Sequence, residues 1–136
     1  TEIYTLSLHD ALPICLAAHM EKHRALLEPK FRAVLAILDE GLSGCGSIAR
    51  WTKPNGGYFL SLYTLGGCAK RTVQLCREAG VVLTDAGAAY PYGVDPQDSN
   101  IRIAPTFPPL DELETASRLL CVCVRIATLE KLLQRQ

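Results

Sequence analysis

The sequence predicts an α+β domain of two layers, in which helices cover one face of a small mixed or antiparallel sheet. Apolar residues recur every three or four positions in three long segments, a spacing typical of amphipathic helices. Between these segments lie short runs rich in β-branched and aromatic residues, bounded by Gly, Pro and Asn, as expected of strands. No strand-like run is followed by a GxGxxG turn and a helix, which disfavours a doubly wound nucleotide-binding fold.

The first helix is expected from Cys15 to Gly41, where apolar residues such as Leu27 and Phe31 repeat at helical spacing. Pro29 interrupts this segment. Because proline clashes with the preceding turn and lacks an N–H group, we expect a kink or a break there, with Pro29 opening the second piece.

A β-hairpin is expected next in the chain. The runs at 47–52 (SIARWT) and 58–63 (YFLSLY) have the composition of strands and flank the turn sequence KPNGG at 53–57. A second amphipathic helix fits Cys68 to Ala79, and Gly80 supplies its end.

The remaining segments complete the α+β pattern. VVLT at 81–84 predicts a short buried strand, and the segment 85–100, rich in Gly, Pro, Asp and Asn, predicts a loop. IRIA at 101–104 predicts one more short strand. A Pro-rich lead then enters a last helix, which we expect from about Pro109 to Leu133.

Charge and hydropathy disfavour several functions. The chain has 14 basic and 14 acidic residues and no basic run, so it lacks the electrostatic footprint of a protein that binds nucleic acid or anionic membranes. Its wholly apolar runs are only a few residues long, far short of a membrane span. We therefore expect neither nucleic acid nor membrane among its partners.

The six cysteines form no CxxC pair and have no histidine at zinc-finger spacing. We interpret them as reduced, mostly buried thiols of a cytoplasmic protein. Cys121 and Cys123 are two apart in a predicted helix, so they point to different faces. His19 and His23 are four apart and could bind a metal if further ligands converged. Since none is visible, a solvated helix face is favoured and no metal site is predicted.

The first fourteen residues, TEIYTLSLHDALPI, do not fit the rest of the chain. They contain no signal-peptide pattern, and their Thr, Ser and Pro residues favour extended chain or helix ends rather than a helix. The segment resembles one translated reading frame of an adapter used in short-read DNA libraries, and the match continues into the Cys15 codon. We therefore expect residues 1–14 to be adapter-derived and non-native. Residues 15–136 are then one domain, the C-terminal part of a larger protein.

One side chain is a candidate for chemistry. In a strand over 101–104, Ile101 and Ile103 face one side and Arg102 the other, so the strand holds Arg102 on a rigid platform. A planar guanidinium grips a carboxylate through two parallel hydrogen bonds, which lysine cannot do. An arginine in a strand is more often a surface charge or part of a structural ion pair, and the residue pattern leaves both interpretations open.

Four segments taken together resemble a known family: WTKPNGGYF at 51–59, EAGVVLT at 78–84, YPYG at 90–93 and NIRIAP at 100–105. Their order and spacing are similar to those of the C-terminal small domain of fold-type I, pyridoxal-phosphate-dependent aminotransferases, close to the aspartate aminotransferase branch. The resemblance extends over roughly residues 16–133. It implies a fragment of a larger α/β enzyme that transfers an amino group between an aspartate-like amino acid and a 2-oxo acid.

The resemblance also implies roles for individual residues. Arg102 binds the α-carboxylate of the substrate, and Gly57 and Tyr58 lie near the mouth of the active site. The lysine that forms a Schiff base with the cofactor belongs to the large domain and has no match here, since Lys53 and Lys70 fall in small-domain motifs. This implies that pyridoxal 5'-phosphate is bound by the missing large domain of a homodimeric parent. This chain then carries no catalytic and no cofactor-binding residue.

A second function stays open on the sequence. The chain could be a free-standing, non-catalytic α+β module that binds a small ligand or regulates another protein. The reading frame upstream of Cys15 distinguishes the two functions, because an aminotransferase requires a large domain there.

Overall fold

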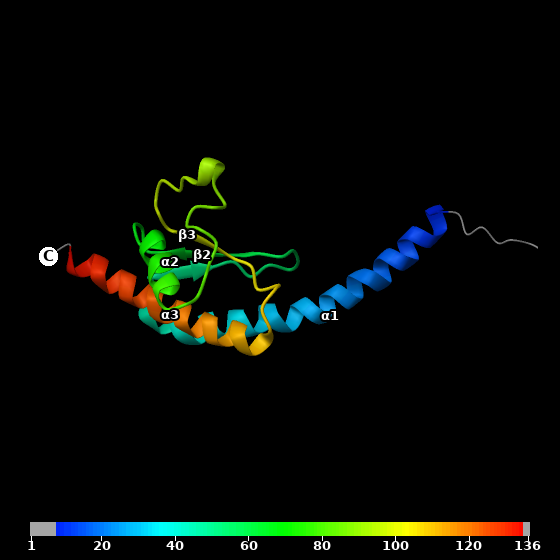
Figure 1. The fold of residues 1–136 in the computed structure, drawn as a ribbon, viewed down its shortest axis with the longest axis horizontal. Coiled ribbons are helices and arrows are strands. Elements are labelled where there is room, and N and C mark those ends of the chain that lie inside the picture. The colour runs from blue at the N-terminus through cyan, green and yellow to red at the C-terminus, as the bar shows by residue number, and fades with distance from the viewer. Residues whose placement is uncertain (1–7, 135–136) are drawn as a thin grey trace, which may run out of the picture.

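In the computed structural model, the chain forms three α-helices and a three-stranded sheet (Figure 1). The structure describes the backbone of residues 8–134 and the side chains of residues 15–134. The elements, in chain order, are α1 (Leu8–Leu42), the short 3₁₀ helix η1 (Ser43–Cys45), β1 (Ala49–Trp51), β2 (Leu60–Thr64), α2 (Ala69–Glu78), the short 3₁₀ helix η2 (Pro91–Gly93), β3 (Asn100–Ile103) and α3 (Leu110–Leu133).

The sheet is antiparallel, with the strands in the order β1-β2-β3. Leu62 of β2 lies opposite Trp51 on one side and Ile101 on the other. Side chains alternate along β2, so that Leu60 and Leu62 are buried and the residues between them are only partly buried. The predicted hairpin and the strand over 101–104 are confirmed.

The core lies between the helices and one face of this sheet. Figure 1 shows α1 and α3 crossing below the strands, with α2 beside β3 and above α3. All three helices contribute side chains to one cluster, which confirms the two-layer α+β prediction. The cluster contains Val34, Ile37, Leu38, Leu42, Leu60, Leu62, Ala69, Val73, Cys76, Ile101, Ile103, Leu113, Leu120, Cys121, Cys123 and Val124.

Helix α1 is continuous through Pro29, so the predicted break is wrong. Proline leaves the carbonyl of Ala25 without its helical donor, but that residue is exposed, so solvent can reach the carbonyl. The Glu28 carboxylate accepts hydrogen bonds from Arg24 and Arg32, one turn to either side, and so links the two halves across the proline. Packing of the segment after Pro29 against the core then fixes the helix direction.

The N-terminal half of α1 projects beyond the body of the domain (Figure 1). Every side chain from Cys15 to Leu26 is exposed, and Val34 is the first fully buried residue of the helix. The helix begins at Leu8, so the expectation of a non-helical start is wrong for residues 8–14. Elongating an existing helix adds one hydrogen bond for each residue fixed, which favours this extension. Residues 1–7 of that expectation lie outside the described residues.

The predicted strand over 81–84 is also wrong, because this segment is irregular. The Val81 amide donates to the carbonyl of Cys76 and so continues the last turn of α2. Val82 is 81% exposed. A strand requires a ladder partner, and in residues 8–134 β3 pairs only with β2.

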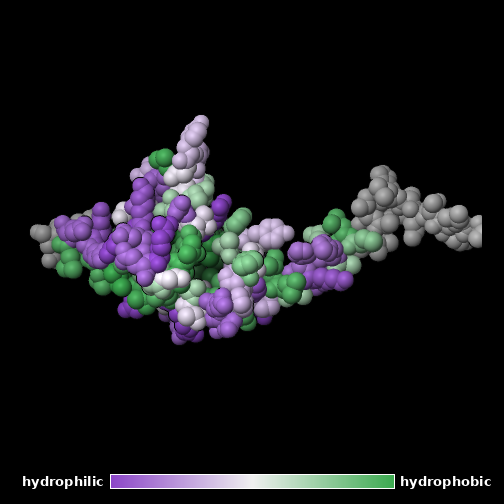
Figure 2. All heavy atoms as spheres, in the orientation of Figure 1, coloured by the Kyte–Doolittle hydropathy of each residue, from purple (hydrophilic) through white to green (hydrophobic). Residues whose placement is uncertain are grey.

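Apolar side chains are exposed along the outer side of α3. Val122, Ile126, Leu129 and Leu133 lie at helical spacing and are 39–69% exposed. In Figure 2, green side chains appear at the surface on the left, where Figure 1 places the C-terminal half of α3. No helix within residues 8–134 combines the length and apolarity that crossing a membrane requires.

Candidate functional site

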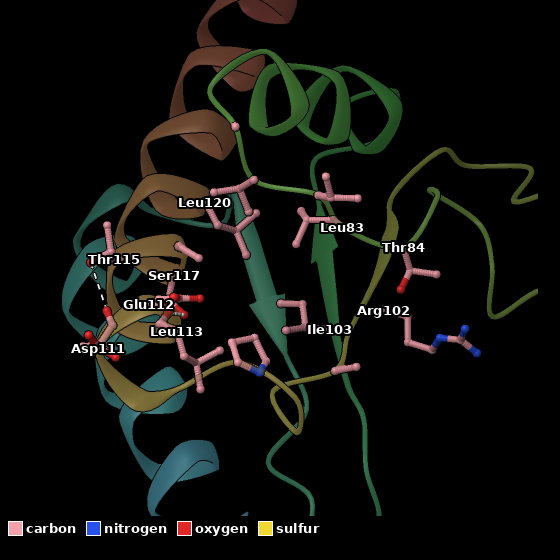
Figure 3. Close-up of a pocket in the computed structure, with 16 residues that line it drawn as sticks. Leu83, Thr84, Arg102, Ile103, Asp111, Glu112, Leu113, Thr115, Ser117 and Leu120 are labelled. Carbon is pink, nitrogen blue, oxygen red and sulfur yellow. Dashed lines mark hydrogen bonds between the residues drawn. The ribbon is translucent and has the colours of Figure 1, made fainter.

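Arg102 lies on the face of the sheet that the helices leave open. Its strand neighbours Ile101 and Ile103 are 0% and 6% exposed and point into the core, whereas Arg102 is only partly buried. Figure 3 shows the guanidinium of Arg102 directed to the opposite side of β3 from Ile103. The orientation expected from strand alternation is confirmed.

The surroundings of Arg102 leave its charge without a counter-ion. Its Cζ atom lies 4.6 Å from the centre of the Phe59 ring, over the ring face. Its Nε atom is buried and has no hydrogen-bond partner among the side chains and backbone described. Within residues 15–134 no carboxylate forms an ion pair with it. The domain therefore presents an arginine whose terminal Nη groups have no acidic partner among the described residues.

Arg71 shows what a structural arginine looks like in this fold. Its Nε and Nη2 atoms donate to the two carboxylate oxygens of Glu130 at 2.7 and 2.9 Å, linking α2 to α3. The hydrogen bond to Glu130 is the main cause that raises the pKa of Arg71. The N–H groups with which Arg71 could bind a ligand carboxylate are therefore already bonded to Glu130. The contrast favours a ligand-binding role for Arg102 over a structural ion pair.

A hollow of about 550 Å³ lies next to β3, but Arg102 does not point into it. Figure 3 shows apolar side chains such as Leu83, Ile103 and Leu120 lining its interior, while Arg102 and Thr84 lie on the far side of the strand. We therefore place the candidate site on the open face of the sheet and not in the hollow.

Gly57 and Tyr58 lie at the tip of the hairpin, away from the guanidinium. Gly57 has a φ of +89°, a conformation that glycine adopts at low cost. Both residues border a second hollow, of about 970 Å³, between the hairpin and the projecting half of α1. The structure does not bring Tyr58 to Arg102 and brings the next residue, Phe59, instead.

The sequence interpretation therefore missed Phe59 as a neighbour of Arg102. Ser61 lies directly opposite Arg102 in the antiparallel ladder. Phe59 is two residues before Ser61 and shares its face of the sheet. Diagonal neighbours of this kind lie within reach of aromatic and long side chains. Strand alternation together with the register between β2 and β3 places the ring beside the guanidinium.

The loop before β3 is fastened by two aspartates. The Asp95 carboxylate accepts hydrogen bonds from the backbone amides of Gln97, Ser99 and Asn100 at 2.7–3.0 Å. The carbonyl oxygen of Asp98 accepts the first amides of α2, and its carboxylate accepts the amide of Lys70. These bonds supply acceptors to the N-terminus of α2 and fix the start of the strand that carries Arg102.

We predict that Asp95→Asn lowers the free energy of unfolding by about 1–3 kcal/mol at pH 7, because charge-assisted bonds are lost. Burial raises the pKa of Asp95, but the bonds from Ser99, Asn100 and Gln97 together outweigh it and lower the pKa below its ordinary 3.8. This stabilisation is complete above pH 3.8 and is lost as the pH falls through the lower folded-state pKa.

The measurement is urea denaturation from pH 7 to pH 2. The wild type should lose stability in the acid range more steeply than Asp95→Asn. Parallel curves for the two proteins would show that this carboxylate does not brace the loop.

The cysteines and the histidine pair do not add a second site. Four of the six thiols, those of Cys68, Cys76, Cys121 and Cys123, are buried, which agrees with the prediction of mostly buried thiols. Burial raises the pKa of Cys76 to about 12 and that of Cys121 to about 11, so both remain protonated at neutral pH. The Nε2 atoms of His19 and His23 are 3.0 Å apart on an exposed helix face. No group of three potential metal ligands occurs among the residues whose placement is described.

Comparison with known proteins assigns the chain to a family. The family model for aspartate amino-transferase matches residues 8–136. The chain belongs to this family. Aspartate aminotransferase of Corynebacterium glutamicum is 49% identical over 113 residues, which are 83% of this chain and 26% of that enzyme. The chain thus spans about a quarter of the length of this relative. The match to the family model starts at residue 8, within the segment expected to be adapter-derived.

Solved aminotransferases share the fold of this aminotransferase segment. An aspartate transaminase from Corynebacterium glutamicum superposes with a TM-score of 0.82 at 48% identity, covering 84% of this chain and 27% of that one. The α-aminoadipate aminotransferase of Thermus thermophilus superposes with a TM-score of 0.71 over 89% of this chain and 30% of that one. At 19% identity, the similarity to the Thermus thermophilus enzyme shows only that the two proteins share a fold. The latter enzyme was solved with N-(5'-phosphopyridoxyl)-L-leucine.

Two lysines of this aminotransferase segment bind other groups of the protein. Lys53 pairs with Asp39 at 3.3 Å, and Lys30 donates to the carbonyl of Thr106 at 2.8 Å. Neither of the two hollows is lined by a lysine. Lys30 and Lys53 are therefore both engaged with other groups of the protein.

Proposed function

We propose that this chain is the C-terminal, substrate-binding domain of a fold-type I, pyridoxal-phosphate-dependent aminotransferase. The parent enzyme transfers an amino group between an amino acid, aspartate-like in character, and a 2-oxo acid. The observation that carries the proposal is Arg102, an arginine held on the open face of the sheet with no acidic partner in residues 15–134. Membership of the family supports it.

In this proposal Arg102 binds the α-carboxylate that every amino-acid substrate carries. Two parallel N–H···O bonds from one planar group fix both the position and the rotation of a carboxylate. Fixing this rotation also sets the direction of the other bonds at the α-carbon. The contribution of the domain to catalysis is then orientation of the substrate. Gly57 and Tyr58 are proposed to border the approach to the site from the hairpin tip.

The cofactor is proposed to lie in a large domain outside this chain. Known aminotransferases of this fold include one solved with a phosphopyridoxyl amino acid, which supports pyridoxal phosphate for the parent. The exposed apolar row along α3, from Val122 to Leu133, supports a further protein surface packed there, because a free domain rarely exposes such a row. We also propose that the parent is a cytoplasmic homodimer.

The chain alone is predicted to bind no pyridoxal phosphate specifically and to catalyse no transamination. The reason is that the resemblance assigns the Schiff-base lysine to the large domain, while Lys30 and Lys53 of this chain bind other groups of the protein. Absorbance titration with pyridoxal phosphate, followed by borohydride reduction and peptide mapping, measures this. Reduction that labels one particular lysine at a saturable site would refute the proposal. The full-length enzyme, assayed in parallel, should bind the cofactor and transaminate.

We further propose that residues 1–14 are not native to this domain. Every side chain from Cys15 to Leu26 is exposed, so the helix that follows this segment is not packed on the core. We predict that deleting residues 1–14 leaves the thermal midpoint Tm unchanged within error, as measured by circular dichroism. A clear fall in Tm would show that the segment belongs to the fold.

A further inference from the structure

The ring of Phe59 lies against the guanidinium of Arg102. The Cζ atom of Arg102 is 4.6 Å from the ring centre, within the distance at which a cation is attracted to an aromatic face. Within residues 15–134 no carboxylate forms an ion pair with the guanidinium, and its Nε atom has no hydrogen-bond partner.

The pairing of β2 with β3 brings these two side chains together. Arg102 and Ser61 are direct partners across β2 and β3, and Phe59 precedes Ser61 by two residues on the same face. Phe59 is 49% exposed, so its ring is not needed to fill the core. The half-exposed ring therefore contacts the arginine from outside the core.

A stacked ring orients an arginine without using its donors. An acidic neighbour occupies the N–H edge, as Glu130 does for Arg71 with bonds of 2.7 and 2.9 Å. An aromatic ring occupies only the flat face, and leaves the N–H groups in the plane free for a ligand. The buried Nε of Arg102 leaves the two terminal Nη groups as the edge that a carboxylate reaches first.

We propose that Phe59 is a positioning residue, which holds the plane of the Arg102 guanidinium so that a substrate carboxylate meets its Nη edge. The inference rests on the proposed function, because it assigns the ligand of Arg102 to the substrate. An arginine that is already held in place loses less side-chain entropy when the ligand binds, so contact with the ring should strengthen the binding of the carboxylate. Phe59 touches the arginine and has no role in the chemistry.

The first test concerns the stack itself and uses the chain alone. Proton–nitrogen NMR of the arginine Nε–Hε groups detects the ring current of a stacked aromatic residue. Phe59→Leu should shift the Arg102 signal and Phe59→Tyr should shift it much less, because tyrosine keeps the aromatic face. Arg50, which stacks on Tyr63 at 4.4 Å on the same sheet, is the control, and its signal should move only in Tyr63→Leu.

The second test uses the full-length enzyme and kcat/KM for an amino acid. Phe59→Leu should lower kcat/KM by about 3- to 30-fold, and Phe59→Tyr should restore most of the loss. In an Arg102→Ala background, Phe59→Leu should have no further effect, because the ring acts only through the arginine. The Tm of each variant is measured in parallel.

The outcomes separate this inference from the proposed function. If Arg102→Ala lowers kcat/KM but Phe59→Leu does not, the positioning role is overturned and the carboxylate-binding role of Arg102 stands. A Phe59→Leu loss that persists in the Arg102→Ala background overturns it as well. Normal activity of Arg102→Ala overturns both, and an unshifted Arg102 signal in Phe59→Leu overturns the stack.

Discussion

In the full-length enzyme, Arg102→Lys is expected to lower kcat/KM by a factor equivalent to roughly 2–4 kcal/mol of activation free energy. Arg102→Ala is expected to lower kcat/KM by a larger factor. Lysine keeps the charge but cannot form two parallel bonds in one plane, whereas alanine loses the charge and the bonds. The substitutions should lower kcat as well as raise KM, since the two parallel hydrogen bonds from Arg102 also orient the substrate. Steady-state kinetics with saturating cofactor measures it.

Two controls accompany this prediction. Arg50→Ala removes a second arginine from the open face of the sheet, one that also stacks on an aromatic ring, and should leave kcat/KM close to the wild-type value. Cofactor affinity of the Arg102 variants should be nearly unchanged, because the cofactor is proposed to bind in the other domain. Normal transamination by Arg102→Ala would assign Arg102 to the surface charges instead.

Leu62→Ala is expected to destabilise the domain by about 2–5 kcal/mol, the range for truncating a buried leucine. Leu62 is 0% exposed and lies in the central strand, between Trp51 and Ile101. Its loss opens a cavity where the sheet meets the helices. Urea denaturation of the chain measures the change in the free energy of unfolding.

Leu26→Ala is the matched control for this core substitution. Leu26 is 69% exposed on the projecting half of α1, so the same change of side chain should alter stability by no more than about 0.5 kcal/mol. A Leu62→Ala variant as stable as this control would show that the core is not centred on β2.

Helices and strands whose apolar residues recur at regular spacing were predictable from the sequence. Elements that depend on contacts with segments far away in the sequence were not. The helix over Cys68 to Ala79 and the strand that carries Arg102 agree with the structure, because their apolar spacing matches the face that they bury. The segment 81–84 has the composition of a strand but no ladder partner in the described chain, and composition does not reveal a partner. Pro29 weakens α1 locally, but packing on the core beyond it keeps the helix continuous.

The candidate site was predictable in part for the same reason. The direction of Arg102 follows from alternation along one strand, a local property. The ring that stacks on it follows from the register between two strands, which a single segment does not contain. The interpretation therefore named Tyr58, one residue away from the contact that the fold makes with Phe59.

The most direct measurement compares an amino acid with the amine that lacks its α-carboxylate, in the wild-type and Arg102→Ala full-length enzymes. The ratio of kcat/KM for the two substrates reports how much the enzyme gains from the carboxylate. If Arg102 binds that group, the ratio of kcat/KM for the amino acid to kcat/KM for the amine should fall by roughly 30-fold or more in Arg102→Ala. The variant should be less active on the amino acid, and its activity on the amine should be unchanged. An equal ratio in the two enzymes would contradict the account.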